Sequence, residues 1–201
     1  MDFAEKKNRL RVLLGASRVF QRKGYAKTRM EDFVEESKIG KKTLYEYYSN
    51  KEEVLKAAAE YRQTKAAYKL KRIRNNRALD FSKRFVKMSK ELLDVCKPSH
   101  FALWKELQDQ IPEIWRMVKA KRVQLIDTEI ESLLEEGKKL GEFRADLRPD
   151  LFIMALIACS DAIYKWEQSP TERRANISEL DNIFLYGIIR RGKETLKSSL
   201  D

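Results

Sequence analysis

The sequence predicts an all-α protein, with an N-terminal three-helix helix-turn-helix head joined by a connecting helix to a C-terminal helical bundle that dimerises. Three observations predict this fold. Only 4 Pro and 7 Gly occur in 201 residues, whereas strands and tight turns need more of both. Apolar residues recur at helical spacing, without the alternation typical of strands. Residues 28–53 contain two short helical patterns separated by a turn signal.

The head begins with a helix over residues 2–22, which Gly24 ends as a left-handed cap residue does. Thr28 is expected to begin the second helix, and Glu31 three residues later completes a capping box. The inward side of this second helix carries Met30, Phe33 and Val34. The second helix is therefore expected to brace the third.

The third helix, near residues 41–48, has the composition of a helix that enters the DNA major groove. Leu44 and Tyr48 lie four residues apart and give it an apolar side. The other side carries cations for phosphates and polar or aromatic side chains for bases and sugars. The candidate DNA contacts over the head are Thr28, Lys38, Lys41, Lys42, Thr43, Tyr45, Tyr47 and Lys51.

The head resembles the DNA-binding signature of the TetR family of bacterial transcriptional regulators (TetR/AcrR type). The resemblance rests on Phe20 with Lys23-Gly24-Tyr25, Thr28, Lys41 to Tyr45, Tyr47-Tyr48 and Asn50-Lys51-Glu52, over about the first fifty-five residues. It implies a DNA-binding domain at 1–55, an effector-binding and dimerisation domain at 56–201, and a connecting helix that carries the ligand signal to the head. Most members act as repressors.

Three positions depart from the usual pattern of that family. Lys38 stands where the turn normally has Gly, Gly40 where a Ser or Thr cap is usual, and Lys42 where Gly is common. Lys at a turn position that needs positive φ costs roughly 1 kcal/mol relative to Gly. Lys42 adds a long cation, for which we expect a phosphate contact or a hydrogen bond to a guanine edge.

Positive charge is concentrated in the head. Residues 1–75 hold 20 Lys and Arg against 10 Asp and Glu, whereas residues 76–201 hold 22 against 21. A solvated charged face does not predict this segregation, and double-stranded DNA is the polyanion that fits the motif. The basic start of the first helix is expected either to lie along DNA or to be a solubilising tip.

The remaining helices are placed by Pro, Gly and apolar spacing. Asn50 caps a fourth helix that continues to residue 74, and a fifth runs from residue 78 to Pro98. A short helix ends before Pro112, and a long one follows to Gly137. Pro149 begins a helix that is apolar around most of its circumference, and the last helix runs from Ser178 to about Lys197.

Apolar residues in the C-terminal part predict two functions. A helix that is apolar on all sides must be buried on more than one side, so the last two helices are expected to form a homodimer, as the TetR resemblance also implies. Aromatic residues near Pro112 suggest a pocket for a small hydrophobic effector, although they also suit an ordinary core. The candidate pocket residues are Phe101, Trp104, Trp115, Met154 and Tyr164.

Other function classes find little support. His100 is the single histidine, and no metal-ligand spacing, nucleophile motif or phosphate-binding Gly loop is present, so we expect neither catalysis nor a cofactor. Cys96 and Cys159 are expected to be buried reduced thiols, and a regulatory disulfide is the second reading. The longest apolar run is about half of a membrane span of roughly 20 residues, so we expect a cytoplasmic protein.

The sequence thus favours a ligand-responsive, sequence-specific transcriptional regulator that binds an inverted repeat as a homodimer, with repression as the family's usual outcome. Two alternatives remain at this point. One is a dimeric DNA binder without an effector. The other is a helical module whose basic N-terminus binds nucleic acid or anionic lipid without sequence preference.

Overall fold

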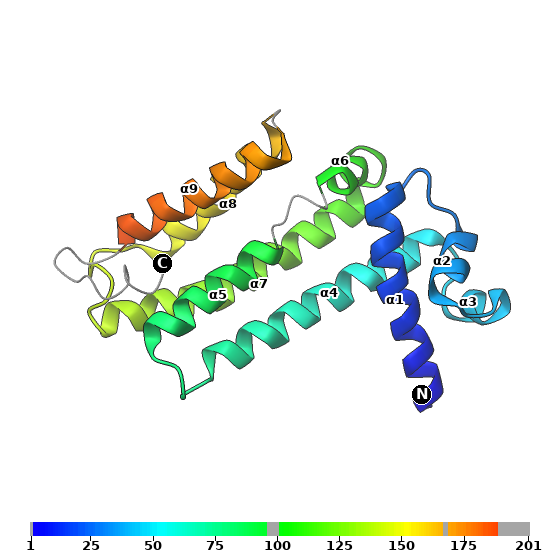
Figure 1. Cartoon of the computed structure of the whole chain (residues 1–201), viewed down its shortest axis with the longest axis horizontal. Coiled ribbons are helices and arrows are strands. Elements are labelled where there is room, and N and C mark those ends of the chain that lie inside the picture. Colours follow the sequence, from blue (N-terminus) through cyan, green and yellow to red (C-terminus); the bar gives the residue numbers. More distant parts are fainter. Residues whose placement is uncertain (1, 96–100, 167–168, 189–201) are drawn as a thin grey trace. The chain divides into compact units, whose positions relative to one another are not determined.

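The structure is a computed structural model that describes residues 2–95, 101–166 and 169–188. Over these residues nine α-helices follow one another, as the sequence predicts (Figure 1). They are α1(Phe3–Lys23), α2(Met30–Ser37), α3(Lys41–Tyr47), α4(Lys51–Arg74), α5(Phe81–Val95), α6(Phe101–Gln110), α7(Pro112–Lys139), α8(Pro149–Lys165) and α9(Pro170–Ile188). The all-α fold class is confirmed.

The chain forms two compact units, whose boundaries fall inside α4, between α5 and α6, and inside α7. The first unit comprises residues 1–65 and 99–121, and the second comprises residues 66–98 and 122–201. These units are defined by packing. The division by function at residues 55 and 56 remains a prediction.

The first unit is built around the inward faces of α1 to α4. Val12, Phe20, Phe33 and Leu44 are each at most 1% exposed, and the rings of Phe20 and Phe33 lie 5.2 Å apart. Residues from α6 and α7 join the same core, among them Leu107 at 4% and Ile114 at 2%. The core of the first unit therefore includes residues that are distant in sequence from α1 to α4.

The second unit has its own core, in which three aromatic rings meet. The ring of Phe143 lies 5.4 Å from Phe81 and 5.1 Å from Phe85. Arg84 donates two hydrogen bonds to the Glu136 carboxylate, one of them at 2.8 Å, and so ties α5 to α7. Within this unit α8 and α9 pack on each other, and the ring centroids of Phe152 and Phe184 lie 5.2 Å apart.

Three helix starts differ from the expectation, and the first is that α5 begins at Phe81 and not at residue 78. Helix α2 begins at Met30, where Asp32 Oδ2 accepts a hydrogen bond from the Arg29 N–H at 2.8 Å, so the capping residues are one position later than expected. Helix α9 begins at Pro170, eight residues before the expected Ser178. Its start is a capping box, because Ser169 and Glu172 exchange hydrogen bonds of 2.8 and 3.2 Å.

Candidate DNA-binding surface

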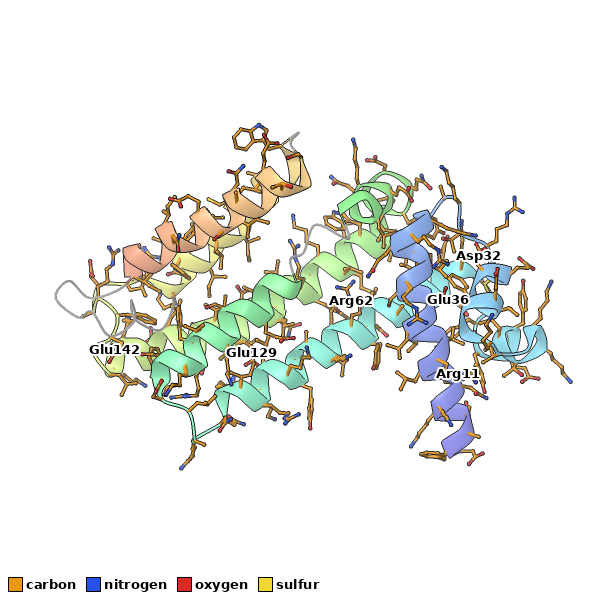
Figure 2. The ribbon with its side chains drawn as sticks, viewed as in Figure 1. Arg11, Asp32, Glu36, Arg62, Glu129 and Glu142 are labelled. Atoms are coloured by element: carbon orange, nitrogen blue, oxygen red, sulfur yellow. The ribbon has the colours of Figure 1, made fainter. Side chains whose placement is uncertain are left out.

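The turn between α2 and α3 has the backbone conformation that the sequence predicted. Lys38 is left-handed, with φ 54° and ψ 41°, and is the one non-glycine residue with positive φ in the described chain. Its N–H donates to the Val34 carbonyl at 3.0 Å. Arg11 of α1, labelled in Figure 2, donates from Nη2 to the Lys38 carbonyl at 3.1 Å. The turn is therefore held from α1, which offsets part of the cost of a lysine there.

Helix α3 is oriented by its apolar side. Leu44 is fully buried and Tyr48 is 7% exposed, so both pack into the first core as predicted. On the other side Lys41 and Lys42 are exposed, and 43% of Tyr45 is exposed. Helix α3 therefore presents two cations and an aromatic side chain to solvent, which is the chemistry that a major-groove helix needs.

Lys41 is already paired in the free protein. Its Nζ lies 2.9 Å from Glu31 Oε1 and 5.9 Å from the ring centroid of Tyr45. The hydrogen bond from Lys41 lowers the pKa of Glu31, and the same bond raises the pKa of Lys41. Both side chains are well exposed, so this pair contributes little to stability and leaves Lys41 able to exchange its partner for a phosphate.

Arg9 is a head residue whose role the sequence did not reveal. Its guanidinium lies 4.7 Å from the ring centroid of Tyr47 and 5.8 Å from that of Tyr48. Burial raises the pKa of Tyr48, and the nearby Arg9 acts in the opposite direction. Arg9 also pairs with Glu5 at 3.1 Å. It therefore orients a candidate DNA contact, Tyr47, from α1. The only sequence signal was the cluster of basic residues near the N-terminus.

Two other candidate contacts have structural partners. Thr28 is 2% exposed, and its hydroxyl donates to the Gly24 carbonyl. Lys51 donates from Nζ to the carbonyls of Tyr25 at 3.0 Å and of Thr28 at 3.3 Å. These bonds hold the segment between α1 and α2. The DNA contacts expected of Thr28 and Lys51 remain predictions, and they compete with these bonds.

The candidate effector residues come from both units. Helix α6 contains Phe101 and Trp104, and α8 contains Tyr164, but these three side chains lie outside the described part of the structure. Trp115 of α7 is half-buried and packs against the core of the first unit. Met154 of α8 is 62% exposed. The effector pocket remains a prediction. His100 and Cys96 lie outside the described residues.

Neither a metal cluster nor a membrane span is found in the described residues. Three or more His, Cys, Asp or Glu side chains do not gather into a possible metal site there. Over the same residues, each helix is too short or too polar to cross a membrane. Cys159 is a half-buried free thiol in α8.

Comparison with known proteins gives a consistent result. Residues 12–58 match the family model described as bacterial regulatory proteins, tetR family. An uncharacterised HTH-type transcriptional regulator of Bacillus subtilis (strain 168), YvaF, is 27% identical over 165 residues, which are 77% of this chain and 80% of that protein.

Solved structures share the fold over most of the chain. A TetR transcription regulator from Haloarcula marismortui ATCC 43049 has a TM-score of 0.74 at 15% identity and covers 92% of this chain and 100% of its own. The fatty acid degradation regulator FadR from Bacillus halodurans has a TM-score of 0.64 at 18% identity, with 90% and 95% covered. Residues 12–58 thus carry the sequence signature of the tetR family, and the chain is similar over most of its length to transcriptional regulators and shares their fold.

Proposed function

We propose that this regulator is a homodimeric, ligand-responsive repressor that acts in the cytoplasm and binds an inverted-repeat operator through α3. The observation that carries the proposal is the two-sided character of α3. Leu44 fixes the helix to the core, while Lys42 and Tyr45 on the opposite side are open to a partner. A helix held rigidly with a polar exposed face is what base-edge reading requires.

The proposed DNA contacts divide by chemistry. Tyr45, Thr43 and Lys42 on α3 are proposed to reach bases or adjacent sugars, and Lys38 and Lys41 are proposed to bind phosphates. Lys42 has no ion-pair partner within the described residues, so it is available without breaking a contact. The remaining proposed contacts are Tyr47, Thr28 and Lys51, which are already engaged in contacts within the head.

A second copy of the chain is proposed to cover α8 and α9. Large apolar side chains are exposed on these helices, with Leu151 at 45%, Met154 at 62% and Ile183 at 60%. A groove beside them is lined by Phe152, Phe184 and other residues of α8, α9 and the segment before α8. Exposed apolar surface of this kind marks an interface. Two-fold symmetry would then place the two α3 helices about 34 to 36 Å apart on DNA.

A small hydrophobic effector is proposed to release the operator. Support comes from the aromatic residues around Pro112 and from the name of one fold neighbour, which is a fatty acid degradation regulator. The effector acts only through a difference in affinity between DNA-bound and free conformations, for which 1 to 3 kcal/mol is typical. The division into a DNA-binding domain at 1–55 and an effector and dimer domain at 56–201 belongs to the same proposal.

The test is selection of bound duplexes from a random DNA library at near-physiological salt, where nonspecific affinity is already weak. Recovery of an inverted repeat with half-sites about one helical turn apart supports the proposal. Recovery of no motif would move the assignment to a nonspecific polyanion binder.

Variants of α3 further distinguish a sequence-specific regulator from a nonspecific polyanion binder. Tyr45→Ala or Thr43→Ala should remove the preference for the selected duplex over a scrambled one, whereas a nonspecific binder would lose almost nothing. An effector-independent regulator is the other alternative. Two results together would favour this alternative. The aromatic side chains would fill the C-terminal core themselves, and no ligand would change the affinity for the operator.

A further inference from the structure

The segment between α1 and α2 is bound by a residue that lies about eighty positions further along the chain. Glu106 of α6 accepts hydrogen bonds at Oε2 from the backbone N–H of Tyr25 and from that of Ala26, the second at 3.2 Å. Glu106 is half-buried, and its neighbour Leu107 is 4% exposed in the core of the first unit. The packing of α6 into this core therefore positions the Glu106 carboxylate beside the segment.

Gly24 makes room for this carboxylate. It has φ 75°, and a Cβ at this position would lie 2.5 Å from Glu106 Oε1 and 2.8 Å from Oε2. After Gly24, two successive backbone N–H groups point at the same oxygen atom. Consecutive N–H groups of this kind form an anion-binding concavity. Here the protein's own carboxylate fills it.

The same segment is also held by Lys51 of α4, which donates to the carbonyls of Tyr25 and Thr28. The N–H groups thus face a carboxylate, and the carbonyls face an ammonium. This segment leads directly into α2, and α2 packs on α1 and on α3. Its position therefore bears on where α2 and α3 lie.

We propose that Glu106 is a positioning residue for DNA binding, which fixes the segment between α1 and α2 and thereby the placement of α3. The proposal rests on the proposed sequence-specific function of α3. According to this proposal α6 contributes to DNA binding by positioning the segment before α2, although α6 lies outside residues 1–55.

Electrostatics and positioning predict opposite effects when Glu106 is removed. Loss of a negative charge from a DNA-binding unit strengthens its attraction to phosphates. Loss of the two hydrogen bonds frees the segment and weakens specific binding. Asp109 is an exposed acidic residue on the same helix, so Asp109→Ala is a control with the same change in charge.

The experiment compares wild type, Glu106→Ala, Glu106→Gln and Asp109→Ala at a temperature where circular dichroism shows all four to be folded. Two duplexes serve as probes, the one selected by the wild-type protein and a scrambled version. Backbone amide exchange of Tyr25 and Ala26 is measured by NMR in the same samples. The glutamine variant keeps an oxygen acceptor for both N–H groups.

We expect Glu106→Ala to bind the selected duplex about tenfold more weakly, equivalent to about 1.4 kcal/mol, with no loss on the scrambled duplex and with faster exchange at both amides. Glu106→Gln should restore most of the affinity, and Asp109→Ala should lose none. Glu106→Ala binding like Asp109→Ala, or unchanged amide exchange, would overturn the proposal. Tighter binding by Glu106→Ala alone would also overturn it, because the carboxylate would then be a competitor of phosphate. If the wild-type protein selects no duplex, it is the proposed function that fails, before any variant is compared.

Discussion

The ammonium of Lys51 lies 4.2 Å from the ring centroid of Tyr25 and donates a hydrogen bond to the carbonyl oxygen of the same residue at 3.0 Å. With the bond to the Thr28 carbonyl, two of the three donors of the ammonium are used inside the head. A position at the start of α4 that suits phosphate binding is therefore also a clamp on the segment before α2.

Lys51→Ala should affect both stability and DNA binding. Loss of the two hydrogen bonds is expected to lower the free energy of unfolding by about 1 to 2 kcal/mol. If the third donor binds a phosphate, affinity falls for all sequences and the salt slope becomes shallower by about one. Lys56→Ala, which removes an exposed cation of α4, is the control for charge. An unchanged salt slope would contradict the phosphate contact, and an unchanged unfolding free energy would contradict the clamp.

Tyr25 should make the head sensitive to alkali. Burial, and secondly the charge of Glu52, raise the pKa of Tyr25 from 10.0 to about 12. In the unfolded chain the phenol loses its proton near pH 10, so the unfolded state binds fewer protons than the native state between pH 10 and 12. Tyr25 therefore leaves the free energy of unfolding unchanged below pH 10. Its ionisation lowers the free energy of unfolding as the pH rises from 10 to 12.

Tyr25→Phe should reduce this loss. The measurement is urea unfolding of wild type and variant at pH values from about 8 to about 11.5, the range that spans the ordinary tyrosine pKa. Tyr68→Phe, at a tyrosine that is 64% exposed, is the control. If the free energy of unfolding falls equally with pH in wild type and in Tyr25→Phe, other groups, and not Tyr25, cause the alkaline instability.

Local features of the head could be predicted from sequence because they depend on near neighbours. The spacing of Val12, Ala16 and Phe20 gave the buried side of α1, and all three are at most 1% exposed. Asn50 was expected to cap α4, and its Oδ1 accepts from the Glu53 N–H at 3.0 Å. Periodicity and capping act over one or two turns of helix, and that is the range over which the sequence is informative.

Long-range contacts could not be predicted in this way. Nothing near Tyr25 indicates that Glu106 accepts its N–H, because no periodic pattern relates residues so far apart. The hydroxyl of Thr28 looked like a helix cap, yet it turns back to Gly24 and leaves the capping role to the next residue. The start of α9 was missed for another reason. Ser169 and Glu172 have the spacing of a capping box, but charged residues follow them and weaken the apolar pattern.

The left-handed Lys38 predicts a stabilising substitution. Lys38→Gly should raise the free energy of unfolding by about 1 kcal/mol, since glycine adopts positive φ without a steric cost. The bond from Arg11 goes to the backbone carbonyl and is kept. Lys42→Gly removes the same charge from within α3 and should lower stability by about 0.5 kcal/mol. The free energies of unfolding are measured by chemical denaturation. A lower value for Lys38→Gly than for wild type would mean that the Lys38 side chain stabilises the turn.

Two helical glycines should respond to alanine in opposite ways. Gly137 of α7 lies against the aromatic cluster, where an added Cβ would overlap the ring of Phe143 and lie 2.8 Å from Phe81 Cζ. Phe143 is 1% exposed, and its ring packs against those of Phe81 and Phe85. Gly137→Ala is therefore expected to lower the free energy of unfolding by about 1 to 3 kcal/mol.

Among the described residues, no atom lies within 4 Å of a Cβ added at Gly187 of α9. Alanine should therefore favour the helix by up to about 1 kcal/mol. If a second copy packs closely at this glycine, however, the added methyl group would weaken the dimer. Sedimentation equilibrium of Gly187→Ala, with thermal unfolding of the same sample, separates the two effects. A weaker dimer with an intact fold supports an interface at α9, whereas an unchanged dimer would place the interface away from Gly187.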